Sequence, residues 1–122
     1  MNEDFIKLYQ HLNIEVLDLM RQIDTLIKRS VDFVIEEKVW SKTAMYYIGK
    51  RTIILALFSD HINIVSNPQI YKDSILYQNA IIENKEFLKG YKITPKGMLQ
   101  IYLGQEVPEQ LLLQIFKQTF TK

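Results

Sequence analysis

The sequence contains no cysteine, which excludes disulfide bonds, thiolate metal sites and cysteine nucleophiles. Its three prolines and four glycines all lie between Gly49 and Pro108, so the first third of the chain has neither residue and is expected to be helical. Long hydrophobic runs are also absent, because the most apolar stretch, 52–58, has seven residues and a membrane-spanning helix needs roughly 20. The start at Met1 is acidic where a secretory signal is basic, and we expect a cytoplasmic protein with no membrane partner.

An excess of one charge is missing as well. Fifteen basic and 14 acidic residues give a net charge of +1, which provides no reason to expect binding to nucleic acid or to an anionic membrane through bulk charge. What the sequence does have is an ordinary globular composition, 48% hydrophobic over 122 residues. These values predict one domain, residues 1–122, with its own core.

Two amphipathic helices are predicted near the N-terminus. The first has Asn2 as its cap, acidic residues in its first turn, and one apolar face formed by Phe5, Leu8, Tyr9 and Leu12. Asn13 is expected to end this helix. The second helix has the strongest pattern in the chain, with an apolar face formed by Val16, Leu19, Met20, Ile23, Leu26 and Ile27.

Four strands joined by short turns are predicted next. They cover an alternating run from Asp32 to Trp40, then 44–48, 52–58 and 61–65, with turns at Gly49 and Ser59. Turns this short require antiparallel neighbours, so the strands form a meander. The strand 52–58 is apolar on both faces, which indicates a central strand that is covered on both sides. The helices cover one side, and curvature, the C-terminal segment or a second subunit covers the other.

The last third is more irregular. Asn67-Pro68 is interpreted as a helix start, with Ile70, Ser74, Tyr77 and Ile81 at helical spacing. The stretch 90–97 reads as a turn into a fifth strand at 98–103. Pro108 then opens a helix whose buried face comprises Leu111, Leu112, Ile115, Phe116 and Phe120. The predicted fold class is α+β, with an antiparallel meander of about five strands and the N-terminal helix pair and C-terminal helix packed on it.

Several segments together resemble the YdhG-like domain family. They are 38–40, 46–50 and 58–62 in the meander, and 90–100 followed by Val107-Pro108 and the amphipathic helix. The resemblance implies a small intracellular α+β domain of a family whose biochemical role is mostly uncharacterised. Some members are described as frataxin-like iron chaperones, which implies iron as a possible ligand here.

The residues themselves offer few chemical motifs. No Gly-x-Ser-x-Gly elbow or phosphate-binding loop is present, and we expect a protein that is not an enzyme. His11 is expected to face solvent. His61 follows Asp60, and such a pair either orients the imidazole for base or ligand work or completes the hydrogen bonds of the turn. Adjacent Glu36 and Glu37 point to opposite faces of a strand, so they cannot chelate one ion together.

Two further groups were weighed as binding sites. Lys85, Lys89, Lys92 and Lys96 lie near Tyr91, but a solubilising lysine face is favoured over a nucleic-acid site. The aromatic residues of the meander form either sheet core, a ligand cleft or a dimer interface. The candidate ligand-binding residues are Trp40, Tyr46, His61 and Lys96.

Two functions stay open at this point. The first is a non-enzymatic module that binds a small ligand or iron. Residues 1–40 carry a net charge of −3 and the rest +4, but neighbouring cations compete with a metal for these acids. The second is a protein-interaction or homodimerisation domain that uses an open apolar sheet face.

Overall fold

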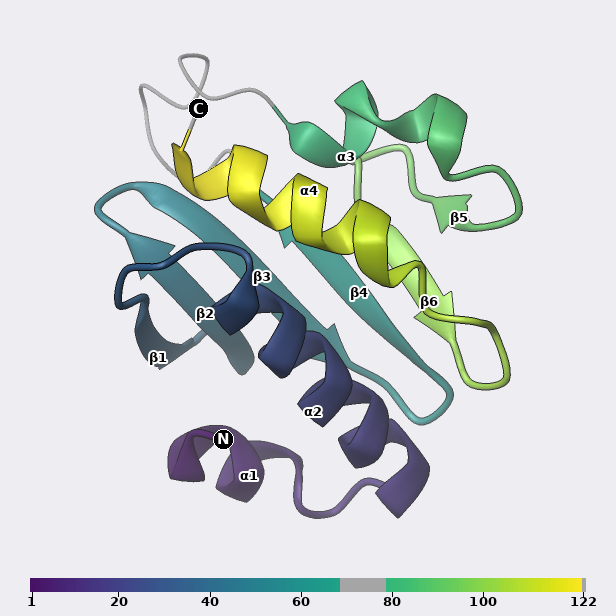
Figure 1. The fold of residues 1–122 in the computed structure, drawn as a ribbon. Helices are drawn as coiled ribbons and strands as arrows, with labels where there is room; N and C mark the ends of the chain where they lie inside the picture. Colours follow the sequence, from purple (N-terminus) through teal and green to yellow (C-terminus); the bar gives the residue numbers. More distant parts are fainter. Residues whose placement is uncertain (69–78, 122) are drawn as a thin grey trace.

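A computed structural model describes residues 1–68 and 79–121 of the chain. In these residues four α-helices and a short 3₁₀ helix accompany six strands (Figure 1). The helices are α1 (Glu3–Tyr9), α2 (Ile14–Arg29), α3 (Ala80–Glu83), η2 (Lys85–Phe87) and α4 (Glu109–Thr121). The strands are β1 (Glu36–Trp40), β2 (Thr43–Ile48), β3 (Arg51–Leu57), β4 (His61–Ser66), β5 (Lys92–Ile93) and β6 (Leu99–Tyr102).

The strands form one antiparallel sheet in the order β1-β2-β3-β4-β6-β5. The α+β class and the four-stranded meander are therefore confirmed. The sheet has one strand more than the five predicted, because β5 lies within the stretch that was interpreted as a turn. Strand β6 does not follow β4 along the chain, yet it pairs with β4 through Ile62 and Ile101.

One layer of helices covers one face of the sheet. Helices α2 and α4 lie side by side across it, and α1 lies beside them near β1 and β2 (Figure 1). The predicted apolar faces of α1, α2 and α4 point into a single cluster of buried side chains, together with alternate residues of the strands. From the strands this core takes Ala44, Tyr46, Ile53, Leu55, Leu57, Ile62, Ile64, Leu99 and Ile101. No described helix is both long and apolar enough to cross a membrane.

The two N-terminal helices begin where the sequence predicts. The side chain of Asn2 accepts hydrogen bonds from the backbone N–H groups of Asp4 and Phe5, at 2.8 and 3.3 Å. Asn13, expected only to end α1, is also the N-cap of α2, because its Oδ1 accepts from the N–H of Val16 at 3.0 Å. Each cap satisfies donors that have no partner within the helix.

Strand β3 lies inside the sheet, paired on one side with β2 and on the other with β4. Its core-facing residue Leu55 is fully buried, and Ala56, which points to the opposite face, is partly buried. The prediction that this strand is central is therefore confirmed, and the helix layer covers the face that carries Leu55.

One predicted strand start differs from the structure by several residues. The first strand begins at Glu36 instead of Asp32, and the exposed Phe33 and Val34 precede it. Asn67, at the predicted helix start, has a φ of +48°, and its Oδ1 accepts a hydrogen bond from the N–H of Thr52 at 2.8 Å. The predicted helix positions Ile70, Ser74 and Tyr77 lie outside the described residues.

Candidate functional site

The side of the sheet that faces away from the helix layer has no described helix packed on it. We call it the second face. By the strand register it carries Glu36, Lys38, Trp40, Thr43, Met45, Tyr47, Thr52, Ile54, Ala56, His61, Asn63, Val65, Gln100, Tyr102 and Lys92, and Phe58 continues it at the end of β3. Met45 and Ile54 are buried here, although they do not belong to the helix-side core. The second face therefore has an apolar centre of its own.

Three aromatic rings stack across one end of the second face. The imidazole of His61 lies between the rings of Phe58 and Tyr102, with centroid distances of 4.6 Å on both sides and interplanar angles of 10° and 23°. The register explains this arrangement, because His61 pairs with Tyr102 and the N–H of Phe58 donates to the carbonyl of His61 at 2.9 Å. Neighbouring strands are about 4.8 Å apart, which is close to the stacking distance of aromatic rings. We call this set the ring ladder.

Asp60 holds the imidazole of the ring ladder in place. Its Oδ1 lies 2.7 Å from Nδ1 of His61, whose side chain is 15% exposed. A carboxylate accepts a hydrogen bond, so Nδ1 carries the proton in the neutral ring and Nε2 is left as an acceptor. Among the described residues Nε2 has no hydrogen-bond partner. This contact fits both interpretations of the Asp60–His61 pair, an imidazole oriented for base or ligand work and a turn completed by a hydrogen bond. In addition, the stacked rings of Phe58 and Tyr102 hold the imidazole on both of its faces.

Polar side chains line the next row of the second face. The hydroxyl of Tyr102 donates to Oε1 of Gln100 at 3.3 Å, and Nδ2 of Asn63 lies 3.9 Å from Sδ of Met98. Oδ1 of Asn63 is buried and has no hydrogen-bond partner in the described part of the chain. A buried acceptor without a partner is uncommon in folded proteins, and leaving this oxygen unpaired destabilises the folded state. This end of the face thus combines aromatic surface with amide groups.

The structure places the four candidate residues at separate positions. Trp40, 38% exposed, lies on the second face on edge strand β1, about 16 Å from His61, because three strand spacings and two residues along the strands separate them. Lys96 lies in the turn before β6, at the opposite end of β4 from His61, where it lines a pocket of about 440 Å³ with Val65 and Met98. Tyr46 points into the helix-side core and is fully buried. The four residues do not form one cleft.

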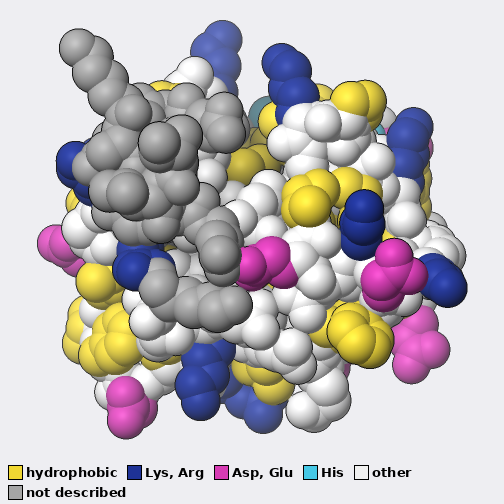
Figure 2. Space-filling view, turned by 90° about the horizontal axis from the view of Figure 1, so that it is seen from above, with side chains coloured by type: hydrophobic (Ala, Val, Ile, Leu, Met, Phe, Trp, Pro, Cys, Tyr) yellow, Lys and Arg dark blue, Asp and Glu magenta, His cyan; other side chains and the backbone are white. Residues whose placement is uncertain are grey.

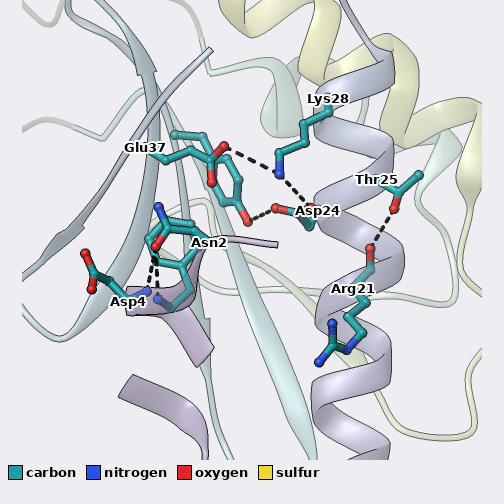
Figure 3. Close-up of polar contacts among 9 residues, drawn as sticks. Asn2, Asp4, Arg21, Asp24, Thr25, Lys28 and Glu37 are labelled. Atoms are coloured by element: carbon teal, nitrogen blue, oxygen red, sulfur yellow. Dashed lines mark hydrogen bonds and ion pairs between the residues drawn. The ribbon is translucent and has the colours of Figure 1, made fainter. Parts of the chain in front are cut away.

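Tyr46 belongs instead to a buried polar network between α2 and the sheet (Figure 3). Its hydroxyl donates to Oδ1 of Asp24 at 2.8 Å, and Nζ of Lys28 lies 3.1 Å from Asp24 and 3.5 Å from Glu37 of β1. Asp24 and Lys28 are four residues apart on α2, the spacing at which opposite charges pair on a helix. Glu36 and Glu37 point to opposite faces, as alternation requires.

The network places one cation between two carboxylates. Burial raises the pKa of Tyr46 far above its usual value, and the negative charge and hydrogen bond of Asp24 raise it further. Burial opposes the charge of Lys28, but its hydrogen bond and charge interactions with Asp24 and with Glu37 outweigh that effect and raise its pKa. Tyr46 therefore stays a neutral donor and Lys28 stays a cation, and the network joins α2 to β1 and β2.

The basic cluster does not form an aromatic-lined groove. All four of its lysines are exposed, and Nζ of Lys89 lies 3.9 Å from a carboxylate oxygen of Glu86. The hydroxyl of Tyr91 donates to the carbonyl of Glu106, and its ring packs against the core. In the view of Figure 2 the basic side chains stand apart, with acidic and apolar side chains between them. The described residues of this region therefore lack the continuous positive groove that single-stranded nucleic acid requires.

Comparisons with known proteins add no further information. No family model, no curated protein and no solved structure matches the chain. The resemblance to the YdhG-like family therefore stays a prediction from the residues quoted for it.

The sequence indicated part of this surface. Alternation placed Met98, Gln100 and Tyr102 on one side of their strand, and it marked Phe58 and His61 as neighbours of one turn. It did not indicate that Tyr102 lies beside His61, because β4 and β6 are separated by more than 30 residues and pair only in the folded chain.

Proposed function

We propose that this protein is an interaction domain that uses the second face to bind another polypeptide. The observation that carries the proposal is the exposure of two large aromatic side chains on a sheet face to which no described helix packs. Trp40 is 38% exposed and Phe58 44% exposed. Aromatic residues are enriched in the cores of protein interfaces, and apolar surface gathered on one face is typical of binding sites.

The local construction of the face supports the proposal. The ring ladder and the Asp60 contact fix His61, so these side chains lose little conformational freedom when a partner binds. Lys38 is held in a similar way, with its Nζ 4.9 Å from the centroid of the Tyr47 ring. A surface that is ordered before binding pays less of the entropy cost of association.

The alternative of a ligand- or iron-binding module has less support. Among the described residues no group of three or more histidine, aspartate or glutamate side chains lies close enough to hold a metal ion. The candidate ligand residues Trp40, Tyr46, His61 and Lys96 are spread over both faces of the sheet. The iron hypothesis therefore has no support beyond the family resemblance.

A photocrosslinking experiment tests the interaction proposal. Phe58 is replaced by photoreactive benzoylphenylalanine in the full chain, in cells that produce the protein, and the matched control carries the same group in place of Phe87. Phe87 is 74% exposed, but it lies beside the N-terminal end of α4, away from the second face. We expect discrete protein adducts from position 58 and far fewer from position 87. Equal yields from the two positions, or none from position 58, would contradict the proposal.

A further inference from the structure

We infer that the partner binds through a basic segment, a stretch of polypeptide with lysine or arginine beside apolar side chains, and that this segment crosses the end of the sheet at the β3–β4 turn. The inference rests on the proposed function, because it names the chemistry of the partner and the part of the surface that it contacts. Exposed apolar side chains at this turn and the carboxylates around them carry the inference.

Three segments of the chain meet at the β3–β4 turn (Figure 1). Nδ2 of Asn13, at the start of α2, donates to the carbonyl of Ser59 at 3.1 Å. The N–H of Leu103, which follows β6, donates to the carbonyl of Asp60 at 2.9 Å. These two hydrogen bonds hold the start of α2 and the segment after β6 against the turn. Side chains from all three segments therefore border one end of the sheet.

Two large apolar side chains are exposed beside this turn. Phe58 precedes the turn on the second face and is 44% exposed, although its ring is held in place by stacking on His61. Ile14 follows the cap residue of α2 on the helix side of the sheet and is 63% exposed. A segment that crosses the end of the sheet from the second face toward α2 covers both side chains, and removing them from water favours binding.

The charged groups around the turn are mainly acidic. The side chain of Asp60 is 66% exposed, and the Oδ1 contact with His61 is its one ion pair in the described part of the chain. Glu15 and Asp18 are exposed and lie one turn apart on α2, and Glu106 is exposed on the loop after β6. The helix dipole accounts for an acidic residue in the first turn of α2, which Glu15 is, but not for the others.

Asp18 and Glu106 lack a counter-charge. Neither carboxylate has an ion-pair or hydrogen-bond partner among the described residues. Arg21 follows Asp18 by three residues, but its side chain extends toward α1 (Figure 3). Lys42 lies in the β1–β2 turn, and strand β2 separates it from β3. Four exposed carboxylates thus surround the two apolar side chains, and the surface that complements them is positive.

A basic segment with apolar side chains fits both features. Lysine and arginine have apolar stems that pack on an exposed ring, and their cations are attracted to its face, so they suit Phe58 as well as the carboxylates. An acidic partner would meet like charges, which opposes both the encounter and the bound state. A second copy of the chain that used the same patch would bring the same carboxylates into one interface.

The crosslinks formed from position 58 test the inference. The full chain with benzoylphenylalanine at this position is irradiated in cells, and mass spectrometry of the digested adducts locates the crosslinked residue in the sequence of each partner. We expect lysine and arginine to outnumber aspartate and glutamate in the segments around the crosslinked residues. Segments of balanced or acidic composition would overturn the inference.

Variants that remove charge provide a second measurement. In the chain that carries the photoreactive group at position 58, the combined changes Glu15→Gln, Asp18→Asn and Glu106→Gln should lower the adduct yield by at least about fivefold. Asp60 is left intact because it holds His61. The control Asp32→Asn should leave the yield unchanged, since Asp32 is exposed but lies beyond the other end of α2. Circular dichroism of the purified variants verifies that they are folded. An unchanged yield in the triple variant would contradict the inferred charge pairing.

The two proposals fail in different ways. If position 58 yields adducts, but neither their composition nor their yield depends on charge, the partner is not basic and the interaction function stands. If position 58 yields no adducts, or no more than position 87, both proposals are wrong.

Discussion

Replacing Tyr46 with phenylalanine removes the hydroxyl group that joins β2 to α2. The ring remains, so its packing against Phe5, with centroids 5.3 Å apart, is kept. What is lost is the 2.8 Å hydrogen bond to Asp24, a residue only 5% exposed. Asp24 keeps Lys28 as a partner. The change is therefore confined to one donor in a buried network.

The free energy of unfolding should fall by about 2 kcal/mol at neutral pH, because a hydrogen bond to a charged group contributes about 1.5–3 kcal/mol. Tyr47→Phe is the matched control. Tyr47 is the next residue of the same strand, but it points to the second face and is only partly buried. Its loss of a hydroxyl should change stability by less than about 0.5 kcal/mol.

The stability difference should also depend on pH. Burial and the charge of Asp24 raise the pKa of Tyr46 in the folded chain, whereas in the unfolded chain the phenol has a pKa of about 10. The stabilisation is fully present below that pH, and it declines above it by about 1.4 kcal/mol per pH unit because only the unfolded state releases the proton. The difference between wild type and Tyr46→Phe should therefore narrow by about 1.4 kcal/mol between pH 9 and pH 11.

Urea unfolding followed by circular dichroism, at pH 7, 9 and 11, measures these differences. A Tyr46→Phe cost no larger than that of Tyr47→Phe would show that the buried hydrogen bond contributes nothing. A difference that does not change between pH 9 and pH 11 would refute the reasoning about the neutral phenol.

Two further substitutions test the fold. Asn13→Ala removes the cap of α2 and the 3.1 Å hydrogen bond from Nδ2 to the carbonyl of Ser59, and it should cost about 1 kcal/mol in urea unfolding. Asn13→Ser should recover most of that loss, and equal stabilities for the two variants would exclude the cap as the cause. Leu55→Ala in the fully buried centre of β3 should cost about 3 kcal/mol. A cost below about 1 kcal/mol would contradict the central position of that strand.

The sequence predicted those parts of the fold in which local pattern and tertiary packing agree. The helical face of α2 and the two-sided apolar pattern of β3 are such cases, since both are long enough for the period to be unambiguous. Strand β5 has two residues, which is too short for any period, and it exists because Ile93 pairs with Leu99 of β6. No local signal could predict it.

The placement of Trp40 and Tyr46 on opposite faces depends on a turn that the sequence does not mark. Trp40 pairs with Thr43, so the turn between them contains only Ser41 and Lys42. Both have positive φ values, +50° and +60°, as in the type I′ turn for which Asn-Gly is the usual sequence. This register puts Trp40 on the face of Thr43, and alternation then puts Tyr46 on the other. A turn longer by one residue would have put Trp40 and Tyr46 on the same face of the sheet.

The inward direction of the Glu37 side chain affects whether the edge strand β1 can pair with another molecule. It lies on the outermost strand, β1, yet its side chain turns toward the helices, where Lys28 neutralises it. A strand from another molecule that paired with β1 would bury this carboxylate further and would pack its own apolar side chains against the Lys28–Glu37 ion pair. The unpaired backbone at that border is thus protected from uncontrolled stacking into fibres, which leaves the chain free to expose aromatic rings on its broad surface.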